Sequence, residues 1–258
     1  MDILSIVQGT WNTTGWVSAI ITFAVLWLTY TIFSIMGFGS AVIAAPVLAM
    51  RMPLPMVVPL LSLLDLVAAL INTRQLSKNI ETKELFLLAP LMASGSSVGI
   101  YLLVSATPTR LMLGLGLFVI AYSLYRLLAP AGPYRISRAW VLLFGLIGGL
   151  FSGMFGSGGF IFSIYLSHRL SEKDTVRATM TAMTGISTLF RTLVFLAIGT
   201  YANPRLLVLA VFGLPAAALG IYCGHHLTLR ISTTQFLRIL CLMLLATGCS
   251  LVWRALHV

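Results

Sequence analysis

Charged side chains are scarce in this sequence. They make up 9% of its 258 residues, whereas 59% are hydrophobic. A water-soluble domain of this length needs far more polar surface, so that class is excluded. Apolar runs of about twenty residues recur along the chain, the length at which a helix crosses roughly 30 Å of hydrocarbon. Because the runs are continuous and do not alternate with period two, they disfavour a β-barrel. The sequence therefore predicts an all-α integral membrane protein.

Acidic residues, histidine and cysteine are also few, with 6 Asp and Glu, 4 His and 3 Cys. The histidines and cysteines lack the spacing of metal ligands or of a disulfide framework, so we expect no metal and no cofactor. Since no nucleotide-binding P-loop occurs, an ion or substrate gradient is the expected energy source. The net charge of +10 comes from basic residues beside apolar segments. That placement indicates contact with membrane lipids and argues against nucleic acid as a partner.

Ten hydrophobic segments follow the order long, short, long, long, long, and this order occurs twice. They cover 17–36, 40–50, 54–72, 85–104, 109–128, 139–155, 158–168, 176–198, 206–226 and 236–256. The Gly-Ile-Tyr sequence at 99–101 recurs at 220–222. We predict two repeats, 1–133 and 134–258, each with one short Gly-broken helix or hairpin and three full transmembrane helices.

Basic residues predict the orientation of these repeats. Suppose that each short segment brings the chain back to the side of the membrane from which the long segment before it started. Eleven basic residues then lie on one side of the membrane and four on the other. The larger group is Arg74, Lys78, Lys83, Arg126, Arg135, Arg138, Arg169, Lys173, Arg177, Arg230 and Arg238, and the smaller is Arg51, Arg110, Arg205 and Arg254. If the short segments do not bring the chain back, eight basic residues lie on one side of the membrane and seven on the other. The positive-inside rule therefore favours inverted repeats in the inner (plasma) membrane, with both termini outside.

Two glycine breaks, at 37–40 and 156–159, each begin a short segment. Eleven helical residues rise about 16 Å, so we expect two hairpins that enter from opposite faces and turn near the midplane. A helix start favours an anion, glycine permits close approach, and serine adds a hydroxyl donor. The predicted substrate-binding residues are Gly37, Gly39, Ser40, Gly156, Ser157, Gly158, Gly159 and Arg191. The alternative, that these glycines only allow close packing, stays open, and it is preferred for Gly145, Gly149 and Gly153.

Two charged residues, Asp65 and Arg191, lie within corresponding segments of the two halves. Buried charges in a membrane are costly and either pair or line a pathway. Two interpretations stay open and do not exclude each other: a structural ion pair, or an anion-binding Arg191 with Asp65 as the carrier of a coupling proton. Thr184, Ser187 and Thr188 precede Arg191 and are expected to add hydroxyl groups.

One motif resembles that of an enzyme. Residues 95–99 fit the G-x-S-x-G pattern of serine hydrolases. That pattern belongs at a strand-to-helix turn, whereas here it lies within an apolar helix and no histidine is expected at the same depth. We interpret it as a packing face and expect no enzymatic activity.

The breaks at 37–40 (with the following Pro46) and 156–160, together with the duplicated halves, resemble the TauE/SafE family of sulfite and organosulfonate exporters, also called the 4-toluene sulfonate uptake permease family. The resemblance covers about 16–256, although Ser40 and Ala41 stand where the family has further glycine. It implies a secondary transporter of sulfite, thiosulfate or organosulfonates that works by alternating access. An anion channel or a transporter of a non-sulfur carboxylate is the alternative. A coupling proton or ion and a homodimer partner are left open.

Overall fold

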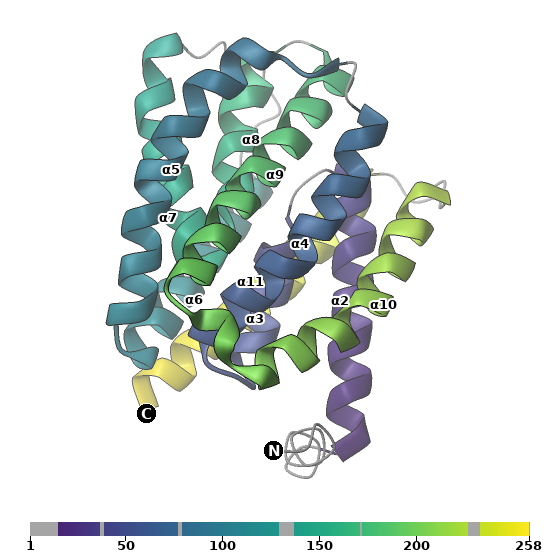
Figure 1. Cartoon of the computed structure of the whole chain (residues 1–258), viewed down its shortest axis with the longest axis vertical. Coiled ribbons are helices and arrows are strands. Elements are labelled where there is room, and N and C mark those ends of the chain that lie inside the picture. Colours follow the sequence, from purple (N-terminus) through teal and green to yellow (C-terminus); the bar gives the residue numbers. More distant parts are fainter. Residues whose placement is uncertain are drawn as a thin grey trace.

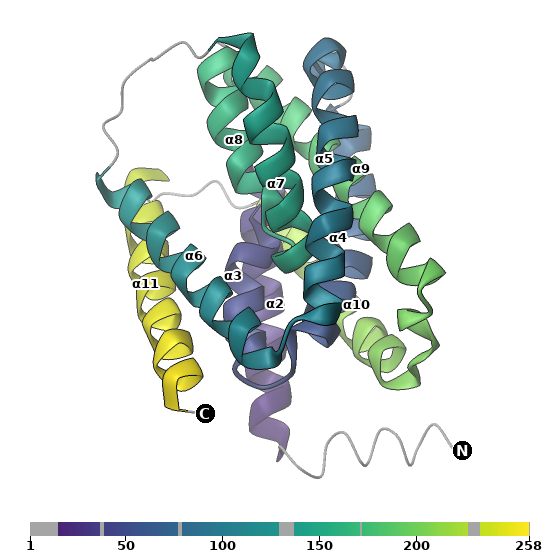
Figure 2. The ribbon, with the colours of Figure 1, turned by 90° about the vertical axis from the view of Figure 1, so that its left-hand side faces the viewer.

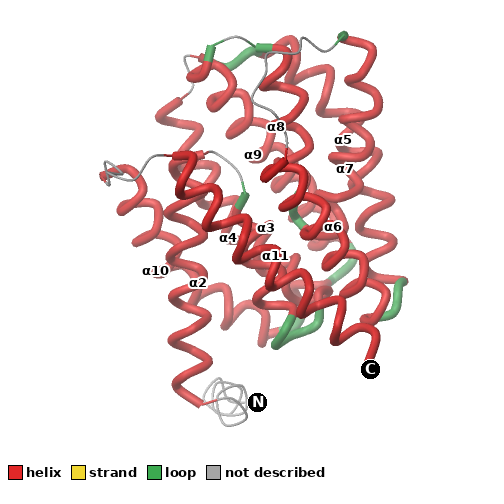
Figure 3. Tube along the Cα trace, turned by 180° about the vertical axis from the view of Figure 1, so that it is seen from behind, coloured by secondary structure: helices red, strands yellow, loops and turns green. Residues whose placement is uncertain are grey.

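The computed structural model describes residues 15–36, 39–76, 79–128, 137–170, 172–226 and 233–257, and within these ranges it is helical without any strand (Figure 3). Each predicted segment corresponds to one helix, with ends that agree within four residues. The helices are α2 (Gly15–Met36), α3 (Ser40–Ala49), α4 (Leu54–Leu76), α5 (Thr82–Ser105), α6 (Pro108–Leu128), η2 (Arg138–Trp140), α7 (Val141–Phe155), α8 (Gly158–Arg169), α9 (Lys173–Ala197), η3 (Thr200–Ala202), α10 (Pro204–His226) and α11 (Thr233–His257).

The outer surface is apolar, and a smaller set of polar side chains is buried within a mostly apolar interior. Six of the described stretches are long and apolar enough to cross a membrane. Large apolar side chains point outward, including Phe86 at 78% exposure and Leu128 at 77%. Serines, threonines, an aspartate and an arginine lie inside. So many large apolar side chains on the surface are unlike a water-soluble protein and typical of a surface in contact with lipid.

Four helix pairs make up most of the bundle: α5 with α7, α2 with α10, α6 with α11 and α4 with α9 (Figure 1). The short helices α3 and α8 lie between the long ones, each against the helix before it and the helix after it. Glycine allows two of these pairs to approach closely. A Cβ on Gly99 of α5 would lie 2.9 Å from the Met154 nitrogen of α7, and one on Gly220 of α10 would lie 2.9 Å from the Tyr30 Cβ of α2.

The G-x-S-x-G match lies in the middle of α5, where Gly95 and Gly99 face the α7 backbone. Ser97 is exposed and donates a hydrogen bond of 3.0 Å to the Ala93 carbonyl in its own helix. Across from α5, a Cβ on three of the four α7 glycines would overlap α5 atoms; these are Gly145, Gly149 and Gly153. The prediction that these small residues serve helix packing is confirmed.

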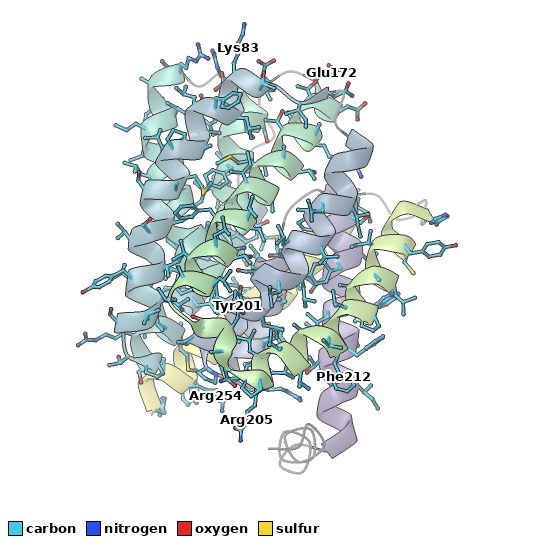
Figure 4. All side chains as sticks on the ribbon, in the orientation of Figure 1. Lys83, Glu172, Tyr201, Arg205, Phe212 and Arg254 are labelled. Carbon is cyan, nitrogen blue, oxygen red and sulfur yellow. The ribbon has the colours of Figure 1, made fainter. Side chains whose placement is uncertain are left out.

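The two hairpins formed by the short helices open towards opposite ends of the molecule (Figure 2). The α2–α3 hairpin opens towards the end at which α2 begins and α11 ends, and the α7–α8 hairpin opens towards the other end. Arg205 and Arg254 lie at the first end, whereas Lys83 and Glu172 lie at the second (Figure 4). The predicted boundary at residue 133 lies outside the described residues, and the division into inverted repeats stays a prediction.

Candidate functional site

Both glycine breaks are turns with left-handed backbone. Gly39 precedes α3 with φ +99°, and Gly156 follows α7 with φ +75°. Glycine adopts this region without the steric cost that a Cβ imposes. At the second break, Gly156 N–H donates to the Ser152 carbonyl at 2.9 Å and Ser157 N–H donates to the Phe151 carbonyl at 3.3 Å. The Gly156 bond is that of the αL motif, which ends α7 and lets α8 begin in a new direction.

The start of α8 carries an unpaired hydroxyl group. Ser157 is 3% exposed, and its Oγ finds no hydrogen-bond partner within the part of the chain that the structure describes. A buried hydroxyl without a partner is costly unless a water or ligand completes it. The first N–H groups of α8 also have no partner within the helix, and such a helix start attracts anions. The break therefore combines a helix start, which favours anions, with a side-chain donor that is not used within the described residues.

The other two predicted glycines of this break differ in their surroundings. A Cβ on Gly158 would lie 2.5 Å from the Ser152 Cβ, because α8 packs directly on α7 at this point. The structure thus places Gly158 in the contact between the two helices. Gly159 is the second residue of α8 and is partly buried.

An ion pair joins α4 to α9 at the centre of the bundle. Arg191 Nη2 lies 3.6 Å from Asp65 Oδ2, and both residues are 1% exposed. The Tyr30 hydroxyl on α2 donates a hydrogen bond of 2.8 Å to Asp65 Oδ1. The Ser40 side chain, in the first turn of α3, is a further hydrogen-bonding partner of the same carboxyl group. The carboxylate thus contacts three other helices.

The Arg191 guanidinium has contacts that do not depend on Asp65. Its Nη1 donates to the Ser152 carbonyl on α7 at 2.9 Å, and its Nη2 donates to Thr188 Oγ1 at 3.3 Å. Its Nε has no partner among the described residues. A buried guanidinium has five N–H donors, so Arg191 retains capacity for a further acceptor. Planar guanidinium groups bind oxyanions well because two of their N–H groups can donate in parallel.

Arg191 also lies against the second break, and the two breaks lie next to each other. A Cβ on Gly156 would be 2.7 Å from Arg191 Nη1 and 2.8 Å from the Ala41 Cβ in the first turn of α3. Ala41 follows Ser40, which is paired with Asp65. The starts of both short helices and the buried ion pair therefore form one candidate site.

The remaining residues of the first break are less fully defined. A Cβ on Gly39 would have no described atom within 4 Å, so the backbone there borders open space. Gly37 lies outside the described residues. The prediction that both breaks supply anion-binding groups stays a prediction.

The hydroxyl residues expected near Arg191 occupy different positions. Thr188 contacts the guanidinium, Ser187 shares a hydrogen bond with Ser152, and the buried Thr184 Oγ1 has no partner in the described part of the chain. The sequence analysis did not single out Tyr30, which contacts Asp65. A tyrosine well inside an apolar segment is a signal for it, because a buried phenol hydroxyl normally has a partner.

The described residues contain no group of three His, Cys, Asp or Glu side chains that could hold a metal ion. A surface groove of about 310 Å³ lies between α4 and α10 and is lined by apolar side chains such as Val67, Ile71 and Val211. Neither Asp65 nor Arg191 lines this groove. Its composition suits lipid contact and does not suit an anion.

The apolar surface and the two broken helices around a buried ion pair define a multi-pass membrane protein with an architecture typical of transporters. Residues 21–251 match the family described as Sulfite exporter TauE/SafE. The match covers nearly the whole chain, and the chain belongs to this family of membrane transporters. The resemblance drawn from the glycine breaks is thereby confirmed. Comparisons with curated proteins and with solved structures gave no match.

Proposed function

We propose that this protein is a secondary transporter that moves small sulfur-containing anions across the cytoplasmic membrane by alternating access. The observation that carries the proposal is the position of Arg191. This buried cation lies against the glycine turn that precedes α8, and its Nε has no partner among the residues that the structure describes. The spare Ser157 hydroxyl at the same turn is a second donor for a bound oxyanion.

The direction of the two hairpins supports alternating access. They open towards opposite ends of the molecule, and their turns meet beside Arg191. The helix pairs α5–α7 and α2–α10 also correspond to each other when the two halves are exchanged, as inverted repeats require. A site between two such halves can open to one side while it is closed to the other. Both termini are proposed to lie on the outer side of the cell membrane.

The burial of the site favours a carrier over a channel. Asp65 and Arg191 are each 1% exposed, so the ion pair is enclosed by the surrounding helices. A channel would need a continuous path past these residues, whereas a carrier passes through an enclosed state. The sulfur chemistry of the substrate comes from the family, and carboxylates remain the competing class of anion.

The test is thermal stabilisation of the purified protein by methanesulfonate, sulfite and thiosulfate, compared with acetate and phosphate. A ligand at a hundred times its Kd raises the unfolding free energy by about 2.7 kcal/mol, so binding shifts the melting temperature measurably. We expect at least one sulfur oxyanion to stabilise the wild type. Stabilisation by acetate alone would contradict the proposed substrate class.

The variants for this test must remove the charge without leaving its partner buried alone. Arg191→Ala alone would leave Asp65 without its counter-ion, which costs about 3–5 kcal/mol. The double variant Asp65→Asn/Arg191→Gln removes both charges and keeps polar side chains at both positions, and we expect it to fold but to lose the anion response. Arg205→Ala, at an exposed arginine, is the matched control and should keep the response. An anion response in the double variant would remove Arg191 from the site.

A further inference from the structure

The candidate site is electrically balanced as it stands. The charged side chains that face each other there are Asp65 on α4 and Arg191 on α9. Among the described residues, the other titratable groups that face them are Tyr30 on α2, at Asp65, and Tyr201 in η3, near Arg191. Helix α3 contributes the Ser40 hydroxyl. With one carboxylate, one guanidinium and neutral tyrosines, the net charge is zero.

We propose that the transported anion replaces Asp65 as the counter-ion of Arg191, and that Asp65 then takes up one proton. Each anion would therefore move together with one proton. This inference rests on the proposed function and adds the coupling ion and its stoichiometry. It also assigns separate roles to the two charged residues: Arg191 binds the anion and Asp65 binds the proton.

The geometry allows the two partners to separate. The Nη2–Oδ2 distance of 3.6 Å exceeds that of a hydrogen bond, so Asp65 and Arg191 attract each other without being tightly joined. Asp65 keeps its position through the 2.8 Å hydrogen bond from Tyr30 and through Ser40. Arg191 keeps its position through the Ser152 carbonyl at 2.9 Å. Loss of the contact between them leaves both side chains held.

The electrostatics favour the exchange. A monoanion bound at Arg191 would leave a net charge of −1 if Asp65 stayed ionised, and an uncompensated charge is strongly disfavoured inside a membrane protein. A proton from solvent that adds to a carboxylate oxygen of Asp65 restores neutrality, and no other bond has to break. The protonated carboxyl group still has an oxygen that can accept the Tyr30 hydrogen bond.

The charge of the anion then determines the net charge that crosses the membrane with each anion transported. A monoanion such as methanesulfonate would travel with one proton, so its transport would be electroneutral. A dianion such as thiosulfate would travel with one proton and move one net negative charge. A structural ion pair that stays intact would instead move the full charge of each anion.

The experiment counts protons taken up when methanesulfonate binds to the purified wild-type protein. Calorimetric titrations in two buffers with different ionisation enthalpies give the number of protons per anion, and methanesulfonate does not titrate in this pH range. We expect one proton per anion and a tenfold loss of affinity for each unit by which pH rises, because binding consumes a proton. Asp65→Asn should bind with affinity independent of pH and take up no proton. Glu84→Gln, at a buried carboxyl outside the site, should still take up one proton per anion.

The outcomes separate the two proposals. Methanesulfonate binding to the wild type without proton uptake overturns the coupling and leaves the anion site in place. Absence of binding by methanesulfonate, sulfite and thiosulfate overturns both. Because the wild-type measurement alone decides the coupling, the result does not depend on the folding of Asp65→Asn.

Discussion

Gly156 meets three demands at once, and they explain why glycine stands at this residue. Its φ of +75° disfavours any side chain. On one side a Cβ would contact the Arg191 guanidinium, and on the other it would contact Ala41 of the opposite break. Its N–H also makes the αL-motif hydrogen bond that ends α7. A substitution at this position therefore changes the relation between the two short helices and the buried cation.

Gly199 provides a matched comparison because it has the same φ of +75° but a Cβ there would have no described atom within 4 Å. Either glycine replaced by alanine carries the left-handed backbone cost of about 1–2 kcal/mol. Gly156→Ala must in addition displace Arg191. We expect both variants to lose similar backbone stability, and only Gly156→Ala to lose at least tenfold in anion affinity. Thermal melts and calorimetric titrations with methanesulfonate measure the two effects, and an unchanged affinity in Gly156→Ala would separate the turn from the site.

At the scale of elements, the α5–α7 contact shows how glycine brings two backbones together. Gly95 and Gly99 on α5 face α7, and Gly149 and Gly153 on α7 face α5. Helices in a membrane gain little from apolar burial against each other, so close packing of this kind contributes to their association. Because α7 ends at the second break, the same contact positions the start of α8.

Gly99→Ala tests this contact, with Gly114→Ala on α6 as the control. A Cβ on Gly114 would lie 3.4 Å from the Phe155 ring, which is close to an ordinary contact. A Cβ on Gly99 would lie 2.9 Å from the Met154 nitrogen and still closer to the Leu150 carbonyl oxygen. Alanine favours a helix over glycine by about 1 kcal/mol, so Gly114→Ala should be neutral or stabilising. Gly99→Ala should lose about 1–3 kcal/mol through overpacking. Thermal unfolding in detergent measures the difference, and equal melting temperatures would argue that α5 and α7 are free to move apart.

Helix positions were predictable from the sequence to within four residues, because each long apolar run must match the thickness of a bilayer and glycine breaks mark the starts of the two short ones. The proximity of Asp65, Arg191 and the two breaks was predictable in outline, since the repeat pattern places them in corresponding segments. The other residues that these groups contact were not predictable from the sequence. Tyr30 contacts Asp65 because of the way α2 is rotated about its axis in the assembled bundle, and the sequence does not determine this rotation. For the same reason, Gly158 was grouped with the ligand-binding glycines although its open side faces α7.

At the scale of the whole molecule, one buried acidic residue contacts several helices at one end of the bundle. Glu84 on α5 is 4% exposed, accepts a hydrogen bond of 2.9 Å from the Tyr165 hydroxyl on α8, and lies 3.3 Å from the Arg169 Nε. The Nε of Arg138 in η2 lies 3.6 Å from the same Glu84 oxygen, Oε1. Lys83 lies at this same end (Figure 4), whereas Arg205 and Arg254 lie at the opposite end. Several of the basic residues predicted to face the cytoplasm thus share one end of the molecule, as the positive-inside rule requires.

The orientation of the molecule in the membrane can be tested with single cysteines at its two ends. The starting variant replaces Cys223, Cys241 and Cys249 by serine, and Arg205→Cys or Lys83→Cys is then introduced, both at exposed residues. If the end with more basic residues faces the cytoplasm, a membrane-impermeant maleimide should label Arg205→Cys in intact spheroplasts and Lys83→Cys only after lysis. The physical reason is that arginine and lysine near the ends of transmembrane segments are retained on the cytoplasmic side. Labelling of Lys83→Cys in intact spheroplasts would invert the orientation. The α7–α8 hairpin would then enter from outside, and the path of the anion and its proton through the site would have to be drawn in the opposite sense.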